Sequence, residues 1–201
     1  MKVEEIITGP SRDEYLDGTT TLAFKNAPTV ATIRDLSLKK VVSPDDIYYG
    51  LINTKGQAVG YFEVRKYDDT KWQVVLVQIA QAYKSQGYGT FFYDYAVMND
   101  KLSILSDVNQ SEGGLGGSKG LWEKLYRHGR FTVCGYDLIT DTILPDATPA
   151  DVYNQKDNIC WLAKPKDNES INEMIIRLND KYDGKRTIVW YGPSIVPDGD
   201  F

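Results

Sequence analysis

The apolar positions along the chain predict a run of strands followed by alternating helices and strands. Residues 47–52, 58–67 and 72–80 are rich in aromatic and β-branched residues, and turn-forming stretches at 53–57 and 68–70 separate them. The third segment is almost continuously apolar, as expected at the centre of a sheet. The pattern therefore predicts three strands joined as an antiparallel meander.

The second half of the chain alternates between helical and extended patterns. Apolar residues at helical spacing predict helices over 91–98 and 118–127. The remaining segments read as strands at 102–106, 131–140 and 159–163, with a long loop over 141–158. Together with the meander, this order predicts a mixed sheet of the α+β or α/β class.

Weaker patterns occupy the two ends of the chain. Residues 3–8 favour a strand and residues 29–38 favour a helix. Ser170 and Glu173 form a capping-box pair at the start of an amphipathic helix in the tail. The last apolar run, 187–191, favours a final strand.

Length, charge and composition narrow the class of protein. A chain of 201 residues is long enough for one sizeable core, so we expect a main domain over 1–165 and a helix–strand extension over 166–201 packed on it. A net charge of −5 argues against non-specific binding to nucleic acid or to a membrane surface. Two cysteines and one histidine exclude a disulfide framework and metal sites built on several of these residues. No apolar run approaches a membrane span and no export signal is evident, so we expect a cytoplasmic protein.

The stretch that carries chemistry is IAQAYKSQGYGT at 79–90, which joins a buried strand to a helix. A helix N-terminus collects backbone N–H groups, and Gly87 and Gly89 let an anion approach them closely. The stretch therefore favours a pyrophosphate-binding loop, and a turn that merely needs glycine is the alternative. Position 92 lacks the third glycine of the dinucleotide motif, and 117–120 has the wrong order for a nucleotide P-loop.

The loop resembles the coenzyme A loop of the GCN5-related N-acetyltransferases. That family's pattern is Gln or Arg, two residues, Gly, any residue, then Gly or Ala. Here Lys84 stands at the Gln/Arg position, and Gly87 and Gly89 match. The order of predicted elements over 47–163 is also similar to that of the family, and the run LWEKL at 121–125 resembles one of its later helices.

A further similarity concerns Ser106, Ser118 and Trp122, whose spacing resembles that in divergent acetyltransferase-like proteins of bacteriophages. The resemblance implies a GNAT-like acyl-CoA N-acyltransferase fold and transfer of an acetyl group from acetyl-CoA to an amine by direct attack. The acceptor would be a small-molecule amine or a protein lysine. In the family, the strand before the loop and the strand at 102–106 splay apart to admit the cofactor.

The resemblance also implies the residues that hold the cofactor. On the strand, the backbone of Val77 and Ile79 would pair with the pantetheine amides, and an N–H near Ile79 would polarise the thioester oxygen. The residues implied for the pyrophosphate are Gln86, Gly87, Tyr88, Gly89 and Thr90.

Candidate acid and base groups are fewer. The family commonly uses a tyrosine of the later helix as general acid, and Trp122 occupies that position here, so Tyr126 is the substitute candidate. Glu63 and Asp107 are the candidate bases. A packed aromatic ring, a solvated strand carboxylate and a turn aspartate are the structural alternatives for these three. We expect the acceptor on the side lined by Asp107, the loop over 112–117 and the helix that carries Trp122.

Two other classes of function remain open at this point. The first is a binding protein that keeps the fold without catalysis, such as a viral protein that occupies a host partner, and Trp122 favours it. The second is amino-acyl transfer or nucleobase modification, and the net negative charge argues against a nucleic-acid substrate.

Overall fold

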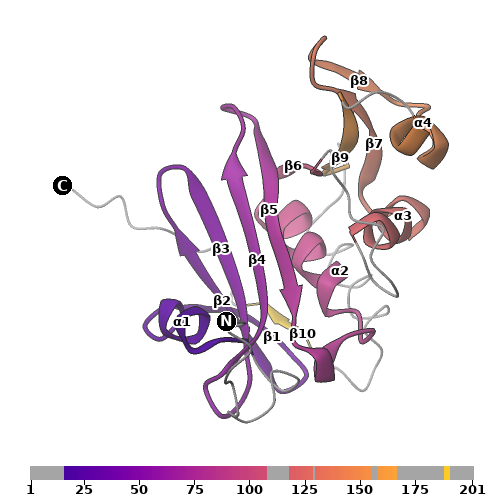
Figure 1. The fold of residues 1–201 in the computed structure, drawn as a ribbon. Helices are drawn as coiled ribbons and strands as arrows, with labels where there is room; N and C mark the ends of the chain where they lie inside the picture. The colour runs from indigo at the N-terminus through magenta and orange to yellow at the C-terminus, as the bar shows by residue number, and fades with distance from the viewer. Residues whose placement is uncertain (1–15, 108–117, 129, 155–157, 167–187, 191–201) are drawn as a thin grey trace, which may run out of the picture.

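The computed structural model describes residues 16–107, 118–128, 130–154, 158–166 and 188–190. Within them, ten strands form one sheet in the order β10-β1-β2-β3-β4-β5-β6-β9-β7-β8 (Figure 1). The strands of the first half are β1 (Thr29–Ile33), β2 (Leu36–Val42), β3 (Asp46–Ile52), β4 (Ala58–Lys66) and β5 (Lys71–Ile79). Those of the second half are β6 (Ser103–Leu105), β7 (Thr132–Asp137), β8 (Thr142–Leu144), β9 (Ile159–Lys164) and β10 (Ile188–Trp190). The helices are α1 (Gly18–Ala23), the 3-10 turn η1 (Gln81–Tyr83), α2 (Tyr88–Tyr93), the π-helix η2 (Asp94–Asn99), α3 (Ser118–His128) and α4 (Pro149–Asn154).

Strands β1 to β5 form a continuous antiparallel meander, which confirms and extends the three predicted strands. The predicted helix over 29–38 is wrong, because this segment is the β1–β2 hairpin. Leu36 and Leu38 are buried while Ser37 between them is partly exposed, which is the two-residue period of a strand. The backbone of Arg34 takes a φ of +54° at the tight turn between the two strands.

Strands β5 and β6 are parallel, but they pair over only three positions. The register joins Lys71 to Ser103, Trp72 to Ile104 and Gln73 to Leu105. Beyond Gln73, β5 continues to Ile79 with no described strand on that side. Figure 1 shows β5 running well past the short β6, with α2 next to the diverging end. This is the splayed strand pair that the family resemblance predicts.

The second half of the sheet has the strand order β6-β9-β7-β8. Here one predicted strand boundary and one predicted loop are wrong. Strand β7 ends at Asp137, because the carboxylate of Asp137 accepts the N–H groups of Ile139 and Thr140 in a turn. The predicted loop over 141–158 contains β8 and α4. The mixed α+β class is confirmed.

The predicted final strand is confirmed as β10, which pairs antiparallel with β1. The predicted strand over 3–8 and the capped tail helix lie outside the described residues. The division into 1–165 and 166–201 therefore stays a prediction.

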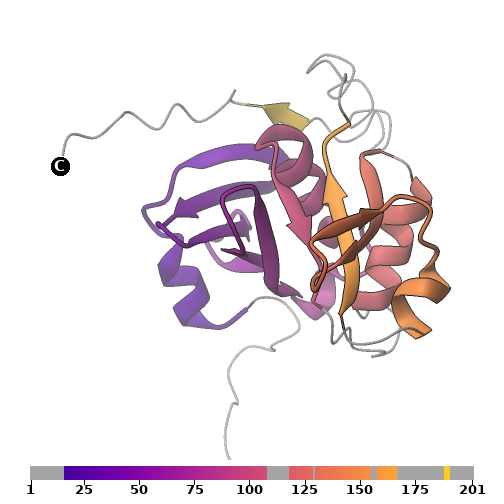
Figure 2. The same ribbon diagram turned by 90° about the horizontal axis from the view of Figure 1, so that it is seen from above.

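The two halves of the sheet meet across a layer of aromatic rings. Figure 2 shows the helix that follows β5 between the meander and the half formed by α3 and β7–β9. The Phe62 ring lies 5.6 Å from Phe92 and 4.9 Å from Tyr93, and Tyr93 in turn meets Trp122 of α3 edge-on at 5.2 Å. Ring pairs at these distances contribute to stability beyond the area that they bury. The helix is thus packed against both halves at once.

Three polar contacts hold η2 at its two ends. At its start, Asp94 is 0 % exposed and forms an ion pair with Arg130, which precedes β7. At its end, Asp100 accepts a hydrogen bond from the Tyr49 hydroxyl at 2.6 Å and pairs with Lys40 at 2.8 Å. A π-helical turn is less regular than an α-helix, and these contacts hold it against the sheet.

The buried pair of Asp94 and Arg130 gives the first prediction. Asp94→Asn keeps the shape of the side chain but removes the negative charge of its carboxylate beside the Arg130 guanidinium. We expect the free energy of unfolding to fall by about 3–5 kcal/mol, measured by chemical denaturation.

The matched control is Asp69→Asn, because Asp69 pairs with Lys66 at 2.8 Å on the surface with its side chain 94 % exposed. Its unfolding midpoint should not move. Equal midpoints for Asp94→Asn and the wild type would show that the buried pair does not hold the two halves together.

Candidate functional site

The loop between β5 and α2 ends at Gly87, which serves as the N-cap of α2 with φ 89° and ψ −1°. This left-handed conformation favours glycine. The Phe91 N–H donates to the Gly87 carbonyl at 3.0 Å, and this is the first intrahelical bond. The N–H groups of the turn before it therefore face the loop and not a carbonyl of the helix.

Gly89 has a different reason to be glycine. A Cβ built on Gly89 would meet nothing nearer than the two methyl carbons of Leu121, at 3.8 and 3.9 Å. Neither packing nor backbone conformation therefore requires glycine at this position. The missing side chain leaves room directly beside the N–H groups of the first helical turn.

The other loop residues that the sequence singled out are arranged around this turn. Tyr88 is buried, and Gln86 is exposed with its amide donating to the Ala82 carbonyl at 2.9 Å. The Thr90 hydroxyl donates to the Gly87 carbonyl at 2.8 Å. In this arrangement Thr90 offers its backbone N–H to an incoming anion, while its hydroxyl proton stays within the helix.

Sequence reasoning missed Arg34, which reaches the loop from the β1–β2 turn. Its Nη1 donates to Gln86 Oε1 at 2.7 Å and to the Tyr88 hydroxyl at 2.9 Å. Its Cζ lies 5.1 Å from the centre of the Tyr88 ring. No local pattern reveals this contact, because 52 residues separate Arg34 from Gln86.

Toward the diverging side, no strand among the described residues pairs with the C-terminal end of β5. The Ala80 N–H donates to the Val59 carbonyl at 2.8 Å, so the antiparallel alternation turns the N–H groups of Val77 and Ile79 away from β4. The side chains of Val75 and Leu76 on the same edge are each 45 % exposed. The edge that the resemblance assigns to the pantetheine is thus accessible from the β6 side.

The structure decides which face of the sheet Glu63 occupies. Its neighbours Phe62 and Val64 are buried on the α2 face, so Glu63 points to the opposite face. Its carboxylate accepts a hydrogen bond from the Tyr61 hydroxyl at 2.8 Å and lies 3.5 Å from the Arg65 guanidinium. Burial and the hydrogen bond to Glu63 raise the pKa of Tyr61 well above its usual value, so this hydroxyl remains a donor to the carboxylate.

Asp107 is exposed and follows the C-terminal end of β6, on the other side of the divergence from Glu63. Its position is set by Ser106, which is buried. The Ser106 N–H donates to the Trp161 carbonyl at 2.8 Å, and the Trp161 N–H donates to the Ser106 hydroxyl oxygen at 3.0 Å. The loop over 112–117, which we expected to line the acceptor side, lies outside the described residues.

Trp122 and Tyr126 lie on α3, one turn apart. Trp122 is 1 % exposed and packs on Tyr93, whose pKa is raised by burial. Tyr126 is 36 % exposed, and its ring centre lies 5.2 Å from that of Trp161. Of the two, Tyr126 alone has a surface from which a proton could pass to a ligand.

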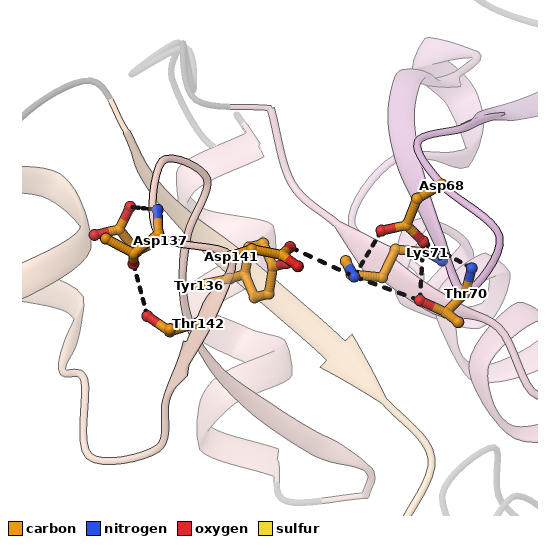
Figure 3. Close-up of polar contacts among 8 residues, drawn as sticks. Asp68, Thr70, Lys71, Tyr136, Asp137, Asp141 and Thr142 are labelled. Atoms are coloured by element: carbon orange, nitrogen blue, oxygen red, sulfur yellow. Dashed lines mark hydrogen bonds and ion pairs between the residues drawn. The ribbon is translucent and has the colours of Figure 1, made fainter.

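A polar cluster surrounds Lys71 at the start of β5, where β5 and β6 pair (Figure 3). Lys71 Nζ lies 2.6 Å from Asp68 in the β4–β5 turn and 3.7 Å from Asp141 in the β7–β8 turn. It also lies 5.3 Å from the centre of the Tyr136 ring, and the Tyr136 hydroxyl donates to Asp141. The cluster joins a turn of each half at the narrow end of the divergence.

The described part of the chain contains no group of three or more His, Cys, Asp or Glu side chains that could hold a metal ion. Its helices are all too short or too polar to cross a membrane.

Comparisons with known proteins give matches at the level of solved structures alone. No model of a known family matches the chain, and no curated protein does. A nourseothricin acetyltransferase is 13 % identical, with 74 % of this chain and 94 % of that chain covered and a TM-score of 0.37. A proposed streptothricin acetyltransferase from Bacillus anthracis, solved in complex with acetyl coenzyme A, is 12 % identical, with 75 % and 97 % covered and a TM-score of 0.38.

A third solved structure, a proposed acetyltransferase of the GNAT family from Bacteroides thetaiotaomicron, is 12 % identical, with 68 % and 70 % covered and a TM-score of 0.33. TM-scores of 0.33 to 0.38 describe a partial superposition of the chains.

The polar cluster around Lys71 gives the second prediction. Burial alone would raise the pKa of Asp68, but hydrogen bonds from Lys71 and Thr70 outweigh it and lower the pKa well below its usual value. A lowered pKa in the folded state means that the ionised carboxylate stabilises the fold above about pH 4, and that this contribution is lost as the pH falls. Asp68→Asn should lower the unfolding midpoint at pH 7, and the gap to the wild type should narrow at pH 3.

The control is Asp45→Asn, because no salt bridge engages Asp45 within the described residues and its side chain is exposed. Its midpoint should follow that of the wild type at both pH values. A gap between Asp68→Asn and the wild type that stays constant from pH 7 to pH 3 would contradict the assignment.

Proposed function

We propose that this protein is an acyl-CoA-dependent N-acetyltransferase that transfers an acetyl group from acetyl-CoA to an amine by direct attack. One observation carries the proposal. No described strand pairs with the C-terminal end of β5 on the β6 side, and this end leads into the glycine loop. The backbone N–H groups of the loop lie at the start of α2, and the missing side chain of Gly89 leaves space beside them. An extended amide chain that ends in a pyrophosphate has groups for both parts of this arrangement.

The residues present fit such a substrate. The backbone of Val77 and Ile79 would pair with the pantetheine amides, because no described strand covers that edge. The pyrophosphate would lie against the turn formed by Gln86, Gly87, Tyr88, Gly89 and Thr90. The structurally similar protein from Bacillus anthracis was solved with acetyl coenzyme A, which agrees with this choice of donor.

Transfer to an amine requires a base for the amine proton and a donor for the leaving thiolate. The amine nitrogen attacks the thioester carbonyl, the C–N bond forms, and the C–S bond breaks. We assign Glu63 as the base, because its carboxylate is fixed by Tyr61 and faces the side of the sheet opposite α2. Asp107 would attract a cationic acceptor, either a small-molecule amine or a protein lysine, and Tyr126 would protonate the sulfur.

The burial of Trp122 supports a second function, a binding protein that has kept the fold without the chemistry. Trp122 occupies the position at which the family commonly has its acid, and it is packed against Tyr93 with no open surface. In that case the protein would bind a partner and transfer no acetyl group. Activity measurements separate the two functions.

Gly89→Asp is the third prediction. The new carboxylate would lie where the pyrophosphate is expected and repel it, while the space beside Gly89 lets the fold accept the side chain. We expect calorimetry to show no binding of acetyl-CoA and the unfolding temperature to stay close to that of the wild type. Gly18→Asp in α1 is the control, since a Cβ on Gly18 meets nothing within 4 Å and Gly18 lies outside the loop. A Gly89→Asp protein that binds acetyl-CoA as the wild type does would disprove the loop assignment.

Glu63→Gln is the fourth prediction. The amide keeps the hydrogen bond from Tyr61 but is no base, so kcat/KM should fall by about 100-fold or more while the Kd for acetyl-CoA is unchanged. Asp107→Asn should raise KM for cationic amines by about fivefold and leave kcat intact. Steady-state kinetics with a panel of amines and lysine peptides measure both.

Unchanged kcat/KM in both variants for every acceptor would remove Glu63 and Asp107 from the mechanism. Binding of acetyl-CoA by the wild type without transfer to any amine would favour the binding protein. No binding at all would contradict the proposed function itself.

A further inference from the structure

Arg34 joins two parts of the chain that the sequence keeps apart. It lies at the turn between β1 and β2, where its φ is +54°. A side chain at so tight a turn projects from the end of the hairpin. Both hydrogen bonds of its Nη1 go to the glycine loop, at 2.7 Å to Gln86 and at 2.9 Å to Tyr88. The β1–β2 hairpin thus places the Arg34 guanidinium beside the start of α2.

The partners of this guanidinium are all neutral. Gln86 and Tyr88 offer an amide oxygen and a hydroxyl oxygen, and no carboxylate among the described residues pairs with Arg34 within 4.0 Å. Its Nε is buried and has no hydrogen-bond partner. The Arg34 guanidinium therefore lacks both a negatively charged partner and an acceptor for its Nε–H among the described residues, and a buried donor without an acceptor is destabilising.

Lys84 does not supply this charge from the position at which the resemblance places a Gln or Arg. Lys84 is exposed, and none of the hydrogen bonds and ion pairs given for the described residues involves its side-chain ammonium group. Gln86 and Tyr88, in contrast, hold the Arg34 guanidinium beside the turn that caps α2. The cation that hydrogen-bonds to this turn comes from a distant hairpin and not from the motif.

We infer that Arg34 is the phosphate-binding cation of this loop and contacts the pyrophosphate of acetyl-CoA. The inference rests on the proposed function and adds to it a residue from outside the loop. A guanidinium suits this task, because it presents several N–H donors in one plane to phosphate oxygens. The side chains of Gln86 and Tyr88 then position the guanidinium, while their backbone belongs to the turn that would hold the pyrophosphate. The pyrophosphate is favoured over the 3′-phosphate because both partners of Arg34 belong to the turn at the helix start.

The experiment measures how Arg34→Gln binds three related probes by calorimetry. Acetyl-CoA carries both the pyrophosphate and the 3′-phosphate, dephospho-CoA lacks the 3′-phosphate, and S-acetylpantetheine lacks all phosphates. We expect the Kd to rise by about tenfold or more for acetyl-CoA and for dephospho-CoA, and to stay unchanged for S-acetylpantetheine. Arg34→Lys, which keeps the charge, should recover part of the loss.

The matched control is Arg127→Gln, the same chemical change at an arginine of α3 that is 72 % exposed and pairs with Glu123. It should bind all three probes as the wild type does. Thermal unfolding of both variants checks that the hairpin still folds.

Each other outcome overturns the inference in a distinguishable way. Wild-type protein that binds no acetyl-CoA contradicts the proposed function and the inference together. Equal affinities of Arg34→Gln and wild type for acetyl-CoA contradict the inference alone. A loss that extends equally to S-acetylpantetheine shows a purely structural role, and a loss that disappears with dephospho-CoA moves the contact to the 3′-phosphate.

Discussion

The short parallel pairing between β5 and β6 is the constraint on which the rest of this structure depends. Because it stops at Gln73, β5 runs on to Ile79 with no strand among the described residues paired to that edge, in the middle of a ten-stranded sheet. An unpaired edge inside a sheet is unfavourable unless something occupies it, so proteins usually cover such edges. Here the open edge leads directly into the glycine loop. The same geometry therefore creates both halves of the candidate site.

Two sets of contacts determine how far β5 and β6 lie apart. At the narrow end, Lys71 draws the β4–β5 turn and the β7–β8 turn together through Asp68 and Asp141. At the wide end, the rings of Phe62, Tyr93 and Trp122 fill the space between the halves. The rigid rings prevent the two halves of the sheet from closing at the wide end, while the ion pairs hold the halves together at the narrow end. The divergence is thus a consequence of packing on both sides.

The sequence predicts those parts of the candidate site that depend on residues close together in the chain. Gly87 and Gly89 stand out because two glycines between a strand and a helix are visible in the sequence itself, and the left-handed backbone of Gly87 favours glycine. The alternation of Glu63 with Phe62 left its face open, and only the packing of Phe62 against α2 decides it. Arg34 could not be assigned to the site from the sequence, because residues 29–38 have a helical pattern and Gln86 lies 52 residues further along the chain. The polar stretch at 141–158 similarly concealed β8 and α4, which are short and have little periodicity of their own.

The sequence by itself determined the meander from β3 to β5, the glycine loop and the amphipathic helix α3, because periodicity and turn chemistry act between neighbouring residues. The tertiary structure alone decided how far β5 and β6 stay together, which face Glu63 takes, how deeply Trp122 is buried and that Arg34 meets Gln86. Each of these depends on contacts between residues far apart in the chain. The loss of chain entropy in closing such loops is offset only by the complete fold, so no short segment of sequence specifies them.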